Sequence, residues 1–183
     1  MNDKQIIQEM IYSSTENEVL QMLETINDEI ILHVYAYNYN WDDGFKISYA
    51  IIDKKCCELS TALMIFYAAD GYKYLQTLNE QQKSSDWLNF IETLYIKIIN
   101  NKYKVGSIKF VPPLNKLQIF KLRNKLPERD QVFLQELGDK NIDINIKLTQ
   151  ELLFDILQNI KIYPNEHIFI RRYKKIEIRM EIY

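Results

Sequence analysis

Residues 1–103 carry apolar side chains at the three- and four-residue spacing of amphipathic helices. Residues 3–12 show this spacing, and Thr15–Glu18 then forms the capping box that opens a second helix. Asp28 is placed to cap a third helix, and Ser85 precedes the most regular apolar spacing in the chain. Two further helices are expected at Lys46–Asp53 and from Ser60 to Leu78, with an end or a kink at Gly71.

Beyond residue 103 the apolar positions change from the period of a helix to that of a strand. Residues 108–110 alternate apolar with polar side chains and then meet two prolines, which suits a short edge strand. Alternation returns over residues 142–148 and 176–182, as in half-buried strands. Helices are expected at residues 127–138 and from residue 149, whereas residues 115–126 are ambiguous.

These patterns predict an α+β fold that is mainly α. Residues 1–103 are expected to form a multi-helical lobe, either HEAT-like or a bundle. Residues 104–183 are expected to form a small α+β lobe with a few strands, packed against the first.

The composition is that of a globular protein. Of the 183 residues, 47% are hydrophobic and 26% are charged, and no run approaches the roughly 20 apolar residues that span a bilayer. The N-terminus lacks the apolar core of a signal peptide, and the adjacent Cys56 and Cys57 are poorly placed to bridge. We therefore expect a cytoplasmic protein with no membrane contact, and the abundance of Ile, Lys, Asn and Tyr favours a bacterial source.

Charge is unevenly distributed along the chain. Residues 1–103 carry 15 acidic against 8 basic side chains, whereas residues 104–183 carry 10 against 15. The two lobes attract each other, or ordinary solvated faces differ in sign, or the acidic part offers a surface to a basic partner.

The segment Asn38–Phe45 concentrates Asn, Asp and Gly with three aromatic side chains. One interpretation is structural: the polar side chains satisfy backbone donors at two helix ends while Trp41 and Phe45 fill the gap between helices. The other is a recognition loop, in which aromatic anchors lie beside paired carboxylates. The candidate binding residues are Tyr39, Asn40, Trp41, Asp42, Asp43 and Asp70.

No catalytic site is evident from the sequence. Asp42, Asp43 and Asp70 are the candidates for holding a metal or a water, with His33 as a base, but the spacings typical of zinc and calcium sites are absent. The chain has 2 histidines, and it lacks glycine-rich phosphate loops and nucleophile elbows. We expect no catalytic residue, metal or cofactor, and an enzyme is the less favoured alternative.

A basic cluster at Arg171–Lys175 contains one aromatic residue. Such clusters can meet phosphate groups, but five residues are a small footprint in a chain with a pI near 5.8. Protection of a strand edge by Lys and Arg is the preferred interpretation, and a nucleic-acid partner is not expected.

Two segments carry a family resemblance. The loop N-Y-N-W-D-D-G-F at Asn38–Phe45 and the segment Cys57–Gly71, of the form C-[DE]-L-[GS]-T-A-L-x-x-F-Y-x-A-D-G, resemble a family of bacterial proteins of unknown function. The succession of helices and loops also resembles HEAT-like α-hairpin repeats. The resemblance implies a helical stack and, by analogy, an immunity-type or accessory protein encoded near toxin or secretion genes.

The favoured function is a non-enzymatic protein–protein interaction, in which the aromatic and acidic loop meets a partner with a basic surface. A hydrolase that uses the clustered aspartates with a metal or a water is the first alternative. A purely structural scaffold is the second. The oligomeric state does not follow from the sequence.

Overall fold

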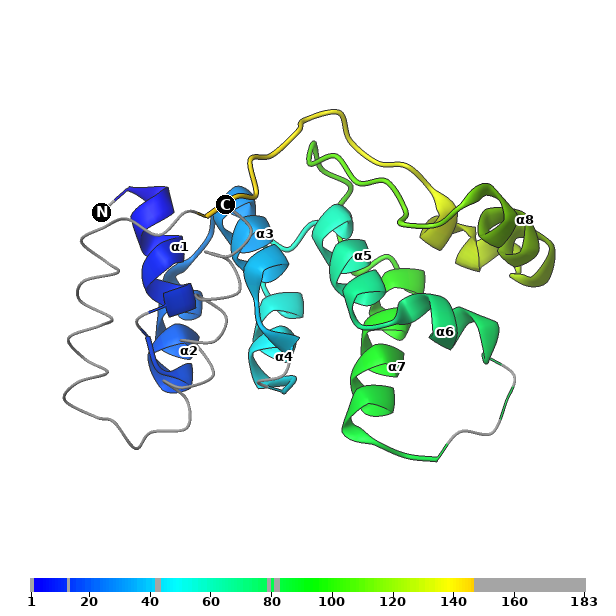
Figure 1. The fold of residues 1–183 in the computed structure, drawn as a ribbon, viewed down its shortest axis with the longest axis horizontal. Coiled ribbons are helices and arrows are strands. Elements are labelled where there is room, and N and C mark those ends of the chain that lie inside the picture. The colour runs from blue at the N-terminus through cyan, green and yellow to red at the C-terminus, as the bar shows by residue number, and fades with distance from the viewer. Residues whose placement is uncertain (1, 13, 42–43, 79, 81–82, 147–183) are drawn as a thin grey trace, which may run out of the picture.

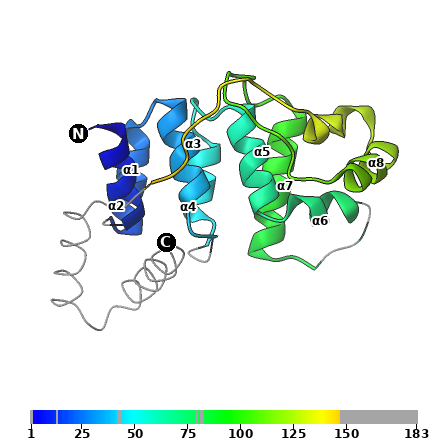
Figure 2. The same ribbon diagram turned by 45° about the horizontal axis from the view of Figure 1, so that its top comes forward.

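The described part of the chain is a row of helices. The computed structural model describes residues 2–12, 14–41, 44–78, 80 and 83–146. In chain order the helices are α1 (Asp3–Tyr12), α2 (Glu16–Thr25), α3 (Glu29–Asn38), α4 (Lys46–Ile52), α5 (Leu59–Ala68), α6 (Gly71–Gln76), α7 (Asp86–Ile99), α8 (Lys116–Lys125) and the 3-10 helix η2 (Glu128–Leu134). The row starts at α1 and α2, continues through α3 and α4 to α5 and α7, and has α8 at its far end (Figures 1 and 2).

Neighbouring helices in this row pack as stacked pairs. Helix α1 contacts α2 and α3, α3 contacts α4 and α5, and α5 contacts α7, while α2 contacts α4. One hydrophobic core runs through the stack and includes Leu32, Leu63 and Phe90, none of which is exposed. The prediction of a multi-helical part within residues 1–103 is therefore confirmed for the described residues, whereas the HEAT-like assignment stays a prediction.

Three predicted helix starts are confirmed by their capping bonds. The Thr15 amide donates to Glu18 Oε2 over 2.6 Å, and the Glu18 amide donates to Thr15 Oγ1 over 3.4 Å. Asp28 Oδ1 accepts from the amides of the second and third residues of α3, and Ser85 Oγ accepts from the Leu88 amide over 3.1 Å. Each bond satisfies an amide that has no partner within its own helix.

The helix expected from Ser60 to Leu78 is divided at Gly71. Helix α5 ends at Ala68, Asp70 adopts a left-handed conformation with φ of 62°, and α6 begins at Gly71. A Cβ at Gly71 would overlap the ring and the carbonyl oxygen of Phe66. Only glycine lets the chain turn this closely against Phe66.

The predicted α+β class is wrong for the described residues, because none of them forms a strand. Ile108 and Phe110 form isolated bridges to Lys140 and Leu137 instead. The alternation in this segment reflects alternating burial and not a sheet. Ile108 is 1% and Phe110 is 8% exposed, while the side chain between them faces solvent. Two prolines follow and prevent the pairing from continuing.

The alternating segment that starts at residue 142 also packs on the helices without pairing in a sheet. The carbonyl oxygen of Ile144 accepts a 2.8 Å bond from Asn38 Nδ2, and Ile146 is 6% exposed. Residues 147–148, the helix expected from Thr149 and the strand expected at 176–182 lie outside the described residues.

The ambiguous segment 115–126 contains α8, and the helix expected from Pro127 is the shorter η2. Side chains on both sides of residue 103 share the hydrophobic core, among them Phe66 and Phe133, whose ring centroids lie 4.5 Å apart. The division into lobes at residues 103 and 104 stays a prediction.

Gly71→Ala should destabilise the protein by about 1–3 kcal/mol, because the added methyl group overpacks a ring that Phe133 holds in place. The measurement is chemical denaturation followed by circular dichroism. Gln76→Ala, at an exposed position of the same helix, is the control and should stay within about 0.5 kcal/mol of wild type. Equal stabilities of the two variants would contradict the close contact between the backbone at Gly71 and Phe66.

Candidate functional site

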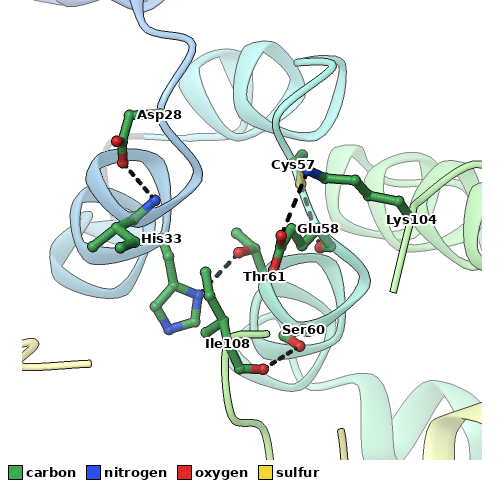
Figure 3. Close-up of polar contacts among 9 residues, drawn as sticks. Asp28, His33, Cys57, Glu58, Ser60, Thr61, Lys104 and Ile108 are labelled. Carbon is green, nitrogen blue, oxygen red and sulfur yellow. Dashed lines mark hydrogen bonds and ion pairs between the residues drawn. The ribbon is translucent and has the colours of Figure 1, made fainter. Parts of the chain in front are cut away.

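The start of α5 carries three buried polar side chains, Glu58, Ser60 and Thr61, that contact two other parts of the chain (Figure 3). Ser60 Oγ donates a 2.7 Å hydrogen bond to the carbonyl oxygen of Ile108. Thr61 Oγ1 lies 2.9 Å from Nδ1 of His33, on α3. The α5 start therefore fixes both α3 and the segment that follows α7.

Glu58, the residue before α5, is 3% exposed. Its Oε1 lies 3.7 Å from Nζ of Lys104, and its Oε2 has no hydrogen-bond partner within the described residues. The free amides at the start of a helix favour a negative charge at this place. A Cβ at Gly106 would overlap the carboxylate, so the backbone passes Glu58 as closely as glycine permits.

His33 is a neutral imidazole at neutral pH. Its side chain is buried, at 5% exposure, and burial lowers the pKa of His33 from 6.5 to about 4. The Thr61 hydroxyl has no other hydrogen-bond partner among the described residues. Either the hydroxyl donates to Nδ1 or the Nδ1 hydrogen is donated to the hydroxyl oxygen, according to the tautomer of the ring (Figure 3).

A pocket of about 580 Å³ lies between α3, α5 and two later segments of the chain, and His33 is part of its wall. This volume falls in the range of small-molecule sites. Most of the lining is apolar. The lining residues are His33, Ala36, Tyr37, Met64, Ile65, Tyr67, Ala68, Lys109, Phe110, Val111, Pro113, Asn141, Ile142 and Ile144.

The pocket offers few polar groups to a ligand. Tyr67 donates its hydroxyl to the carbonyl oxygen of Phe133 over 2.7 Å, and burial raises the pKa of Tyr67. Lys109 is the one residue of the lining set that is charged at neutral pH, and its side chain is exposed. The remaining polar lining residues are His33, Tyr37 and Asn141.

The described part of the predicted loop packs against the core. Tyr39 donates its hydroxyl to the Gly44 carbonyl oxygen over 3.0 Å, and its ring centroid lies 5.9 Å from that of Trp41. The Trp41 ring lies 6.1 Å from Phe90, on α7, and both Tyr39 and Trp41 are half-buried. These contacts agree with the structural interpretation of the loop.

The other candidate binding residues are placed as follows. Asn40 is half-buried beside Tyr39, and Asp70 is exposed at the turn between α5 and α6. Asp42 and Asp43 lie outside the described residues. The binding role of this set therefore stays a prediction.

Within the described ranges, no group of three or more His, Cys, Asp and Glu side chains is arranged to hold a metal ion. His33, the base of the hydrolase alternative, bonds to a threonine. Both cysteines are buried thiols, and burial raises the pKa of Cys57 to about 12, so its reactive thiolate is scarce at neutral pH.

Sequence reasoning missed the surface formed by α8. Its single buried residue is Leu122, while Leu117 and Phe120 are 61% and 64% exposed. The capping box of this helix was legible in the sequence: the Gln118 amide donates to Asn115 Oδ1 over 2.9 Å, and the Asn115 amide donates to Gln118 Oε1 over 2.8 Å.

Comparison with known proteins identifies one domain. Residues 27–99 match a family described as "Domain of unknown function (DUF4274)", so such a domain is present in this chain. The match runs from the cap of α3 to the end of α7 and leaves α8 outside. No curated protein and no solved structure matches the chain. Among the described residues, no helix combines the length and the apolar character needed to cross a membrane.

Replacing His33 should change how stability depends on pH. The folded pKa lies below the unfolded one, so the unfolded chain binds the extra proton and stability is lost as the pH falls from about 6.5 towards 4. Between pH 8 and pH 5, wild type should lose about 2 kcal/mol relative to His33→Gln, which does not titrate. Urea unfolding of both proteins at several pH values measures this difference. A constant difference would contradict the neutral buried imidazole.

Gly106→Ala should cost about 1–3 kcal/mol, because its methyl group collides with the Glu58 carboxylate. Adding Glu58→Ala removes the collision, so the double variant should be more stable than the sum of the two single effects. A double-mutant cycle by denaturation measures this coupling. Strict additivity would show that the two residues do not meet.

Proposed function

We propose that this protein is a non-enzymatic interaction protein and that its basic helix α8 contacts an acidic surface with an apolar centre on a partner protein. The observation that carries the proposal is the pair of exposed side chains Leu117 and Phe120 on a basic helix.

The two apolar side chains form a continuous anchor. Leu117 and Phe120 are three residues apart in α8, so they lie on the same face of the helix. Both leave more than half of their surface in water. Contact with a partner would remove this apolar area from water, as the central residues of an interface do.

The charge around this anchor favours an acidic partner. Helix α8 contains Lys116, Lys121, Arg123 and Lys125 and no acidic residue. The wider segment 102–127 also lacks Asp and Glu, although the whole chain has a net charge of −2. An acidic rim on the partner would speed encounter and fix orientation. A nucleic-acid backbone would match the charges but would leave Leu117 without an apolar counterpart.

An immunity-type or toxin-neighbourhood accessory role is one form of this proposal, in which the partner is a toxin. It is supported by the family resemblance alone. A partner with a basic surface would instead meet the acidic helices within residues 1–103, and this stays a separate prediction.

The test is affinity capture from the native host's lysate with the full chain. Leu117→Ser/Phe120→Ser should lose a protein that wild type retains, since the apolar anchor is gone while the charge is unchanged. Lys121→Glu/Arg123→Glu should lose the same protein, and the wild-type interaction should weaken as salt rises.

The matched control is Ile96→Ser, which removes a side chain on α7 that is 52% exposed. This variant should retain the partner, and thermal unfolding should confirm that all variants are folded. The proposal fails if the α8 variants retain every protein that wild type does. It also fails if no protein is retained specifically, or if nuclease abolishes retention.

A further inference from the structure

The walls of the pocket between α3 and α5 suit an aliphatic ligand. Ala36 comes from α3, Met64 and Ile65 from α5, and Ile142 and Ile144 from the segment that follows η2. Such walls attract apolar surface without fixing its orientation. Met64 adds an adaptable side chain that can follow the shape of a flexible chain.

The polar groups of the pocket suit a ligand that carries one anionic group at one end. Lys109 is the one residue of the lining set that is charged at neutral pH, and the set contains no Asp or Glu. A carboxylate at Lys109 would therefore meet one opposite charge and no like charge from these residues. The exposed side chain of Lys109 places this end of the ligand near water, which limits the cost of burying the charge.

A peptide fits this pocket less well than a fatty acid. Each buried peptide unit brings one donor and one acceptor, and leaving them unpaired costs free energy. The hydroxyl of Tyr67 is already bonded to Phe133, which leaves His33, Tyr37 and Asn141 as uncharged polar partners. A hydrocarbon chain needs none of them.

We propose that this pocket binds an aliphatic monocarboxylic acid, with its hydrocarbon chain between α3 and α5 and its carboxylate at Lys109. The ligand site is distinct from the α8 surface and does not depend on the protein–protein role proposed for that helix.

Isothermal titration calorimetry with the full chain tests the ligand class. The probe is decanoate below its critical micelle concentration, compared with decanol and decylamine, which carry the same hydrocarbon chain. Decanoate should bind at least about 10-fold more tightly than decylamine, because Lys109 attracts one head group and repels the other. Absence of decanoate binding, or equal affinities for the two charged probes, would overturn the proposal.

Two variants test the role of the head group. Lys109→Gln should weaken decanoate binding about 10-fold while leaving decanol binding unchanged. Lys102→Gln removes an exposed lysine outside the pocket lining and should leave both affinities unchanged. The same loss in both variants would show that decanoate responds only to overall charge.

The methyl groups of methionine report where the probe binds. In spectra of the protein labelled at these methyl groups, decanoate should shift the signal of Met64, which lines the pocket. The signals of Met10 and Met22, which do not line it, should stay in place. Ala68→Phe, at an exposed lining position, should block the shift while the protein stays folded. Shifts of Met10 or Met22 without a shift of Met64 would place the probe elsewhere and overturn the proposal.

Discussion

The buried polar side chains at the start of α5 hold the rest of the described structure in register. Ser60 binds the backbone of Ile108, and Thr61 binds His33 on α3. A buried hydroxyl or imidazole without its partner costs about 1–3 kcal/mol, so a shift of either neighbour would leave groups unsatisfied. Glu58 adds a steric constraint, because Gly106 must pass against its carboxylate. The pocket exists because these contacts fix its opposite walls.

Aromatic side chains extend this constraint to the rest of the stack. Phe90 of α7 stacks on Phe45 with ring centroids 4.8 Å apart and also meets Trp41, which attaches the loop after α3 to the later helices. On the other side, Tyr95 donates a 2.7 Å bond to the buried carboxylate of Asp130 and secures η2. The loop around Trp41 therefore has a packing role that any binding role must accommodate.

Features encoded within a few residues were predictable from the sequence. The caps at Thr15, Asp28 and Ser85 use bonds that span three residues or fewer, so the local sequence contains both partners. The packing of Trp41 was left open between a structural and a recognition interpretation, because its partner Phe90 lies too far away in the sequence for the local pattern to show the contact. The remaining features of the fold depend on contacts between residues far apart in the sequence, so the local pattern did not predict them.

The prediction of strands is wrong for the described residues, because alternation shows which side chains are buried but not whether a sheet or helices bury them. Phe110 is buried against Tyr67 of α5, and the bond from Ser60 to the backbone of Ile108 joins residues 48 positions apart. Ser60 itself was expected to start a helix, yet its hydroxyl binds across the structure. In α8 the apolar residues lie around much of the helix, so neither the period of a helix nor that of a strand was evident.

The residues that line the pocket come from two parts of the chain, one inside and one outside the range that matches DUF4274. His33, Met64 and Ile65 lie within residues 27–99, whereas Lys109 and Ile142 follow that range. The matched domain thus supplies an apolar wall and a neutral imidazole, and the following segment supplies the charge. A chain that shares only the matched residues would keep the wall but not Lys109. Ligand selectivity should therefore depend on the segment that Ser60 and Gly106 hold against α5.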